Sequence, residues 1–287
     1  MITRCTIGEM MIAALARTIA DGDLVFHGFG SPLVQLALHV AKRTRAPHMV
    51  LVAGATYGVD PTPPFLAPTS NDWVMDRGAN CWLDIEELFD LAAVGRMGRM
   101  FLSGLQIDRW GNCNVTALGR GAMTMKLPGG GGGANLSCDA RRLTLWTAAH
   151  RAPPDASGRR RFRLVEACDF ITNLGHRGAD GTPRARYGHI GGGPDWLITE
   201  LGVFDFDAEG HMRLAARYAD VSVQEIVDNT GFPLRMADTI DIVAPPDRRI
   251  VEIIRALDPL NVHARELRAE DASRSFDLAD ATEKERA

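Results

Sequence analysis

The sequence predicts an α/β protein built on an open, mostly parallel sheet with flanking helices. The prediction starts from two short apolar segments, 24–26 and 49–52, which suit buried strands, and from the amphipathic run 33–40 between them, which suits a helix. Strand, helix and strand at this spacing form a β–α–β unit, whose strands lie parallel in one sheet. The length of 287 residues allows one large domain or two smaller ones.

Local signals set the ends of the first two helices. Thr6 and Glu9 have the spacing of a capping box, which opens a helix that we expect to run to about Ala20. Pro32 suits the first turn of the second helix, and the Lys-Arg pair at 42–43 places cations at its C-terminus.

The rest of the chain continues the alternation of strands and helices. We expect strands at 100–102 and 143–146, a strand pair near a sheet edge at 197–199 and 201–206, and helices at 84–92, 223–228 and 245–257. The polar stretch 151–163 is expected to be a surface loop. From Arg265 onward the sequence is charged and poor in apolar residues. We therefore predict one α/β domain over 1–264 and a charged, partly disordered C-terminal tail over 265–287.

Composition excludes several classes of function. A net charge of −4 gives no general attraction to nucleic acid or to an anionic membrane. No apolar run approaches the ~20 residues of a membrane span, and the first residues do not resemble a signal peptide, so we expect a cytoplasmic protein. The five cysteines form no CxxC pair, and the eight histidines lack paired carboxylates at ligand spacing. We therefore expect neither a disulfide framework nor a metal site.

Five consecutive glycines at 129–133, followed by Ala and Asn, are the most unusual feature of the chain. Glycine loses more backbone entropy on folding than any other residue, so such a run needs a reason. One reason is a nest of backbone N–H groups that binds an oxyanion or phosphate; another is a flexible linker. The apolar segments on both sides favour the nest. The residues predicted to contact a ligand here are Gly131, Gly132, Gly133, Ala134 and Asn135.

Two further turns combine glycine with polar residues. Gly28-Phe29-Gly30 between strand and helix invites a dinucleotide site, but Leu33 stands where the third glycine is required, so a simple tight turn is the alternative. The stretch 104–114 is rich in Gly, Asn and Asp, which build structural corners by bonding their own backbone. Its Gln106 is also placed to line a cleft at the end of the preceding strand.

Separate motifs follow one another in a fixed order along the chain, at 27–33, 40–47, 106–114, 132–135, 161–162, 201–206 and 229–232. Together they resemble the β subunit of family I CoA-transferases, most of all the glutaconate CoA-transferase type, over about residues 6–260. The resemblance implies an open α/β fold and an α/β hetero-oligomer (αβ or α2β2) with its active site where subunits meet. It also implies an acyl-CoA substrate, a Gly-rich loop at the thioester oxyanion, and no cofactor other than the CoA that the substrate carries.

The chain departs from this family at one position. The resemblance implies a β-subunit glutamate seven residues after the Ala-Pro pair, whose carboxylate attacks the thioester and then carries CoA. Counted from Pro47, that position is Gly54, and no Glu occurs between Glu9 and Glu86. Asp60 is the nearest acid. We expect the small residues around Gly54 to open space where the nucleophile would stand.

A small residue in place of the acid also resembles a branch of CoA-transferase-like hydrolases, which cleave a ring carbon–carbon bond of CoA esters in steroid catabolism. That resemblance implies a general base from the partner α subunit, no catalytic residue in this chain, and hydrolysis of an alicyclic or β-keto acyl-CoA. The residues implied to bind substrate, besides the Gly-rich loop and Gln106, are Gly28, Gly30, Ala53 and Gly54. Two alternatives remain: a transferase with a displaced nucleophile such as Asp60, and a non-catalytic acyl-CoA-binding subunit.

Overall fold

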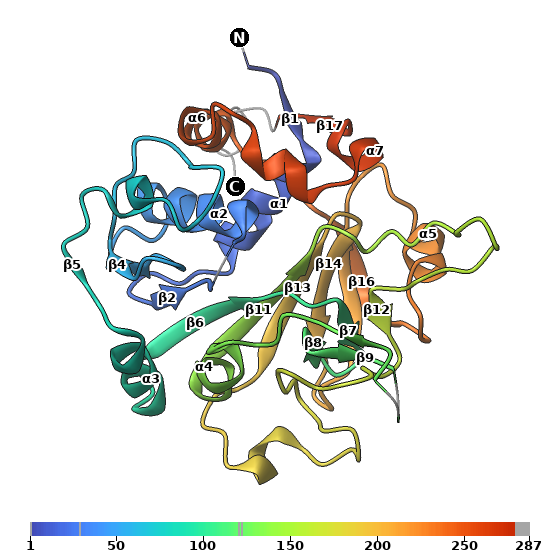
Figure 1. The fold of residues 1–287 in the computed structure, drawn as a ribbon. Coiled ribbons are helices and arrows are strands. Elements are labelled where there is room, and N and C mark those ends of the chain that lie inside the picture. The colour runs from blue at the N-terminus through green and yellow to red at the C-terminus, as the bar shows by residue number, and fades with distance from the viewer. Residues whose placement is uncertain (1, 29, 120, 122, 279–287) are drawn as a thin grey trace. The chain divides into compact units, whose positions relative to one another are not determined.

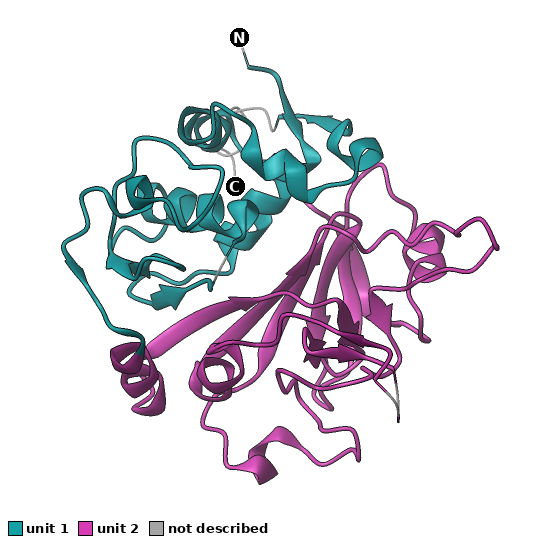
Figure 2. Cartoon of the chain, in the orientation of Figure 1, with its two compact units in different colours: residues 1–85, 244–287 teal, residues 86–243 magenta. Residues whose placement is uncertain are grey.

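The structure is a computed structural model that describes residues 2–28, 30–119, 121 and 123–278 (Figure 1). The chain forms two compact units, one of residues 1–85 with 244–287 and one of residues 86–243 (Figure 2). These units subdivide the stretch that the sequence assigned to one domain. Each combines strands with helices, and the predicted α/β class is confirmed.

Unit 1 is built on a short sheet and two buried helices. Its elements are β1 (Arg4–Thr6), α1 (Ile7–Arg17), β2 (Leu24–Phe26), α2 (Pro32–Arg43), β3 (Val50–Val52), β4 (Gly58–Val59), η1 (Trp73–Asp76), β5 (Cys81–Trp82), α6 (Arg248–Leu257), η3 (Val262–Glu266), α7 (Ala269–Ala272) and β17 (Ser275–Asp277). Four of its strands lie in the order β2-β3-β4-β5, with β2 and β3 parallel and the later pairs antiparallel. The predicted β–α–β unit is therefore confirmed as β2–α2–β3.

The capping box of α1 forms as the sequence predicts. The Thr6 hydroxyl accepts from the Glu9 N–H at 3.2 Å, and the Glu9 carboxylate accepts from the Thr6 N–H at 2.7 Å. The helix ends at Arg17, before the expected end at Ala20. The Glu9 carboxylate is buried and also accepts from Arg255 Nε of α6 at 2.7 Å, so the cap ties the two ends of the unit together.

The chain from Arg265 to Leu278 is folded, within the segment that the sequence suggested to be a charged, partly disordered tail. β17 pairs antiparallel with β1, and Phe276 lies opposite Cys5. Asp271 is almost completely buried, and its Oδ1 lies 3.2 Å from Arg274 Nη1. Some of the charges that made this segment look solvated, Asp271 and Arg274, thus pair within the fold. Residues 279–287 lie outside the described part of the chain.

Unit 2 is built on a six-stranded sheet. Its elements are α3 (Ile85–Ala93, starting at the unit boundary), β6 (Met97–Leu102), β7 (Gln106–Asp108), β8 (Cys113–Asn114), β9 (Ala117–Leu118), β10 (Met125–Lys126), α4 (Gly133–Asp139), β11 (Arg142–Thr147), β12 (Leu164–Val165), η2 (Arg184–Tyr187), β13 (Pro194–Thr199), β14 (Gly202–Phe206), β15 (Met212–Arg217), α5 (Val223–Asp228) and β16 (Arg235–Ile242). The strand order is β6-β11-β13-β14-β15-β16, and β12-β7-β8 form a smaller sheet.

The strand directions of unit 2 agree only partly with the sequence-based expectation. β11 is parallel to both β6 and β13, whereas β13, β14 and β15 are antiparallel. The predicted pair β13–β14 is confirmed, but it does not end the sheet, because β15 and β16 extend it. No helix in the described part of the chain is long and apolar enough to cross a membrane.

Candidate active site

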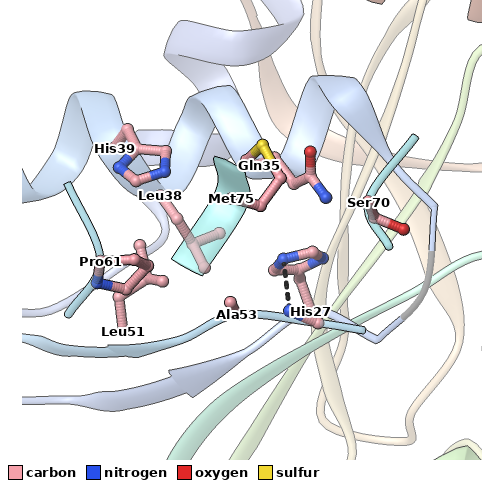
Figure 3. Close-up of a pocket in the computed structure, with 10 residues that line it drawn as sticks. His27, Gln35, Leu38, His39, Leu51, Ala53, Pro61, Ser70 and Met75 are labelled. Atoms are coloured by element: carbon pink, nitrogen blue, oxygen red, sulfur yellow. Dashed lines mark hydrogen bonds between the residues drawn. The ribbon is translucent and has the colours of Figure 1, made fainter. Parts of the chain in front are cut away.

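The ends of two parallel strands bring the first predicted site residues together. β2 and β3 pair with Phe26 beside Val52, so the residues after them leave the sheet at the same edge. His27 and Gly54 meet there: the Gly54 N–H donates to His27 Nε2 at 3.1 Å (Figure 3).

The backbone at Gly54 is in direct contact with the chain at Gly28. A Cβ added at Gly54 would lie 1.6 Å from the Gly28 carbonyl oxygen and 2.5 Å from His27 Cε1. Real side chains never approach backbone this closely, so position 54 has no room for any side chain in this conformation. The open space expected at Gly54 is therefore absent, because the Gly28 backbone fills it.

The turn after Gly54 is held by a buried carboxylate. Asp76 Oδ1 accepts from the Gly58 N–H at 3.2 Å and from the Thr56 hydroxyl, while Oδ2 accepts from Trp82 Nε1 at 2.7 Å. Tyr57, inside this turn, has a positive φ of 62°. These bonds fix the turn, and it cannot easily move to make room at position 54.

Asp60 does not replace the missing acid. Its Oδ1 accepts from the Leu51 N–H at 2.9 Å and lies 2.7 Å from Lys42 Nζ. It is thus fixed beside Leu51, three residues before Gly54 in sequence. At about 3.3 Å per extended residue this is about 10 Å from Gly54. The carboxylate stabilises the β3–β4 connection and does not reach the Gly54 end.

His27 is buried and neutral. Its side chain lies in an apolar environment, and burial lowers the pKa of its imidazole to about 4. Because Nε2 accepts from Gly54, the proton of the neutral ring is assigned to Nδ1, which has no hydrogen-bond partner among the described residues. The ring borders a cavity of about 10 Å³, lined also by Gln35, Ser70 and Met75, which has room for about one water molecule (Figure 3).

A larger cavity, of about 260 Å³, lies at the start of α2. Gln35 and Ser70 line this cavity as well as the one beside His27, and the Gly30 N–H donates to Ser70 Oγ at 3.0 Å. Its single carboxyl among the described lining residues is Glu266, whose Oε2 accepts from the Leu33 N–H at 2.9 Å. Burial raises the pKa of Glu266 to about 7.

The glycine run of unit 2 is an ordered loop that leads into α4. The Gly129 N–H donates to the Val115 carbonyl at 2.8 Å, and the Gly133 N–H to the Gly130 carbonyl at 2.7 Å. The linker alternative therefore does not describe this segment. Within the described part of the chain, the N–H groups of Gly131, Gly132, Ala134 and Asn135 donate no hydrogen bond.

Only some of these glycines are required by the backbone. Gly129 and Gly131 have positive φ values of 91° and 51°, a region that favours glycine. A Cβ at Gly130 would lie 2.7 Å from Thr172 Cγ2. Gly132 has φ −76°, and a Cβ at Gly133 would meet nothing closer than 3.7 Å. Position 133 can thus hold a small side chain, and the φ of Gly132 is one that any residue adopts.

The polar turn at 104–114 is a structural corner. Asp108 accepts from the Trp110 N–H at 2.9 Å and from both the N–H and the side chain of Asn112. Gln106 Oε1 accepts from Asn114 Nδ2 at 2.8 Å and from the Asp169 N–H at 2.9 Å. The side-chain carbonyl of Gln106 is therefore used within the fold.

The structure arranges the predicted site residues in two groups. In unit 1, Gly28, Ala53 and Gly54 form one cluster, and Gly30 lines the cavity next to it. In unit 2, Gln106 and the loop 129–135 are linked through β8 and the residue after it. No group of three His, Cys, Asp or Glu side chains among the described residues is placed to hold a metal ion.

Comparison with known proteins identifies the family. The model of the coenzyme A transferase family matches residues 8–230. The chain belongs to the coenzyme A transferase family. It is 29% identical over 255 residues to a subunit of the 3-oxoadipate CoA-transferase of Pseudomonas knackmussii, covering 87% of this chain and 92% of the relative. It is 24% identical over 267 residues to the cholesterol ring-cleaving hydrolase IpdB subunit of Mycobacterium tuberculosis, covering 92% and 99%.

A solved structure agrees with this assignment. The decarboxylase AibA/AibB superposes with a TM-score of 0.76 at 31% identity, covering 91% of this chain and 98% of that one. The family that the motifs resemble is thereby confirmed. The relatives bear the names of a transferase, a hydrolase and a decarboxylase, so membership of the family does not specify the reaction.

Sequence reasoning missed the cavity at α2 and its carboxyl. Glu266 and Leu33 are 233 positions apart, and neither carries a local motif. The charged composition after Arg265 indicated solvent exposure, yet it is the packing of η3 on α2 that buries Glu266. No signal in a single sequence marks this contact.

Proposed function

We propose that this chain is the β subunit of a heteromeric enzyme that hydrolyses a carbon–carbon bond of an alicyclic or β-keto acyl-CoA, as in the degradation of steroid-like rings. The observation that carries the proposal is the contact between Gly54 and the Gly28 carbonyl. It excludes a side-chain nucleophile at the position where the family resemblance implies a glutamate. With Asp60 bound to Lys42, the covalent route has no attacking group in this cluster.

A β-keto acyl-CoA can be cleaved without a protein nucleophile. A base takes a proton from water, and the resulting hydroxide adds to the ketone carbonyl. The carbon–carbon bond then breaks, and its electron pair passes to the carbon next to the thioester as an enolate. Such a reaction requires a base, oxyanion donors and a proton for the enolate carbon. The unpaired N–H groups of Gly131, Gly132, Ala134 and Asn135 are suited to an oxyanion, and the water-activating base is proposed to come from the α subunit.

Decarboxylation of an acyl-CoA is the second candidate, and the 31% identity to the decarboxylase AibA/AibB favours it. It breaks a carbon–carbon bond in the same manner and leaves the same kind of enolate, but releases carbon dioxide and consumes no water. CoA transfer, the activity named for the relative from Pseudomonas knackmussii, needs the attacking group that position 54 cannot hold.

An α-subunit partner is part of the proposal, because the relatives are named as subunits. Each unit of the chain exposes large apolar side chains that suit such a contact. Trp73 and Trp82 are 79% and 58% exposed in unit 1, and Val94 and Ile190 are 72% and 60% exposed in unit 2. Expressed alone, the chain should self-associate. A monodisperse, fully active monomer in size-exclusion chromatography would contradict the heteromeric model.

The experiment is a product analysis on the chain co-purified with a family α subunit. A cyclic β-keto acyl-CoA is supplied in water labelled with heavy oxygen, together with acetate, and the products are analysed by mass spectrometry. A ring-opened acid that carries one heavy oxygen supports the hydrolase. Loss of carbon dioxide supports the decarboxylase instead, and formation of acetyl-CoA would contradict both. If changes in this chain leave the activity unchanged, the chain is a non-catalytic subunit.

A further inference from the structure

The cavity at the start of α2 is built from unit 1 alone. Its walls come from α2 and the residue before it, from the segment 67–70, and from η3. At about 260 Å³ it is slightly smaller than the ~300–1,000 Å³ of typical ligand pockets, so it suits an acyl group better than a whole CoA ester. The CoA part of a bound substrate would lie outside it.

Glu266 is the carboxyl of this cavity, and its position is fixed. Oε2 accepts from the Leu33 N–H at 2.9 Å, and the Ser31 side chain also bonds the carboxyl. Both partners belong to the first turn of α2, where free N–H groups favour a carboxylate. The side chain is nevertheless half-buried, and the loss of solvation outweighs these two bonds. Its pKa is therefore raised to about 7.

Few other charges surround this carboxyl. Among the described lining residues, Arg265 is the one other charged side chain, and it is exposed. The lining residues from α2 and from 67–70 are uncharged, including Gln35, Thr69 and Ser70. On η3, His263 is paired with Asp258 at 2.7 Å between Nδ1 and Oδ2. Burial, without a neighbouring anion or metal, therefore accounts for the raised pKa of Glu266.

The cavity is connected to the Gly54 cluster through shared walls. Gln35 and Ser70 line the cavity of Glu266 and also the small cavity beside His27 and Gly54. These two polar side chains therefore border both the cavity that holds Glu266 and the cavity that Gly54 lines. Glu266 is the one Asp or Glu among the described residues that line either cavity.

We propose that Glu266 is the proton donor of the carbon–carbon cleavage and acts on an acyl group held in this cavity. The proposal rests on the proposed function. When the bond breaks, its electron pair remains on the carbon α to the thioester carbonyl. The Glu266 carboxyl gives its proton to that carbon, a C–H bond forms, and the carboxylate left behind takes a proton from solvent. The same step completes hydrolysis and decarboxylation, because both leave the same enolate.

The test uses proton exchange as well as cleavage. In heavy water, the Glu266 carboxylate should remove the α-hydrogen of a saturated alicyclic acyl-CoA and return deuterium to the same carbon. This substrate has no bond to cleave, so only the C–H bond is broken. Mass spectrometry of the recovered ester measures this exchange. The variant is Glu266→Gln, which keeps an oxygen to accept from Leu33, and the control is Glu270→Gln, an exposed carboxyl on α7.

We expect Glu266→Gln to lower both exchange and cleavage by about 10²-fold, within the usual range for a general acid or base, with KM little changed. In the wild type, exchange should rise with pH through about 7 while cleavage turnover falls, because one needs the carboxylate and the other the acid. Wild-type exchange in Glu266→Gln, or no exchange in the wild type, would overturn the proposal. Glu266-dependent exchange without cleavage would support it and contradict the proposed function instead.

A measurement without substrate shows whether the variant is folded and whether the carboxyl titrates as required. The pKa of Glu266 is higher in the folded chain than the 4.5 of the free group, so the folded state binds its proton more tightly. Its contribution to stability is therefore lost as the pH rises from about 4.5 to about 7. Between pH 5 and pH 8 the wild type should lose up to about 3 kcal/mol of unfolding free energy that Glu266→Gln does not lose. The melting temperature of the wild type should therefore fall relative to that of Glu266→Gln over this range. If the melting temperatures of wild type and Glu266→Gln changed in parallel with pH, the proposal would be contradicted.

Discussion

The Gly54 turn of unit 1 and the glycine run of unit 2 use the same residue for different reasons. At Gly54 the constraint is a contact, because the Gly28 carbonyl occupies the place of a Cβ. At Gly129 and Gly131 the constraint is a torsion, because φ is positive while nothing lies within 4 Å of an added Cβ. Gly54 closes a site to side chains, whereas Gly129 and Gly131 permit a backbone conformation that other residues rarely adopt. The single Gly54 therefore restricts which side chains its position can hold more than Gly129 or Gly131 does by contact.

Substitution of Gly54 tests its contact with the Gly28 carbonyl and should have the strongest consequence. Gly54→Ala should lower turnover by at least ~10²-fold and also lower the melting temperature, because the methyl group would overlap the Gly28 carbonyl and displace the oriented backbone. Gly54→Glu should not restore or improve activity, since its backbone cannot place the carboxylate. Steady-state kinetics and thermal unfolding measure both effects, with Ala55→Gly as the neighbouring control. Wild-type turnover in Gly54→Ala would remove this turn from the active site.

The requirement for a positive φ distinguishes Gly131 from Gly133 within the glycine run. Gly131→Val should reduce turnover by about 10- to 10²-fold, because a β-branched residue at φ 51° is strained by at least ~1 kcal/mol and the N–H groups would turn away. Gly133→Ala should stay within a few-fold of wild type, since its added Cβ makes ordinary contacts. Size-exclusion chromatography should show that both variants still assemble. Equal losses in both would indicate that bulk, and not torsion, is decisive.

Buried histidines make both units sensitive to acid. Burial lowers the pKa of His27 to about 4 in unit 1 and that of His150 to about 3 in unit 2. A histidine whose folded pKa lies below its unfolded value binds the proton more weakly when folded, so stability falls as the pH drops from about 6.5 toward these values. The melting temperature should therefore fall steeply in this range. His150→Gln should flatten the curve, whereas the exposed His48→Gln should not. Coincident curves for wild type and His150→Gln would refute this explanation.

The smallest effect concerns cysteine reactivity. Cys81 is exposed on β5, whereas Cys5 and Cys113 are buried and burial raises the pKa values of both thiols. A thiol-specific reagent should therefore label Cys81 in unit 1 first, and the cysteines of unit 2 only slowly. Peptide mapping after brief labelling identifies the site. Fast labelling of Cys113 would mean that unit 2 opens more readily than its packing indicates.

Local and long-range features differ in how far the sequence could predict them. The capping box of Thr6 and Glu9 and the unit β2–α2–β3 depend on neighbouring residues, and both are confirmed. β16 was missed because Asp238 interrupts its apolar face and most of its residues are exposed. The folded segment after Arg265 was missed because its charges pair with one another and with distant elements.

In the candidate site, too, the sequence predicted the local features and not the long-range contacts. The motif order pointed to the family and to the glycines, because these signals are local. The sequence showed that Gly54 is no acid, but it could not show that the Gly28 carbonyl closes the position, since this contact joins two strand ends. Five identical residues in a row also could not show which of them need glycine, whereas the structure places positive φ values at Gly129 and Gly131. The meeting of Glu266 with Leu33 depends on tertiary packing alone.

On the proposed function, this chain contributes no covalent nucleophile. The test is to incubate the complex with its acyl-CoA, treat it with borohydride or hydroxylamine, and measure the intact mass of each subunit. A glutamyl or aspartyl thioester would be converted to an alcohol or a hydroxamate and would change the mass of the subunit that held it. The structure predicts an unchanged mass for this chain during turnover. A trapped adduct on this chain, mapped to Asp60 or to any other carboxylate, would contradict the account.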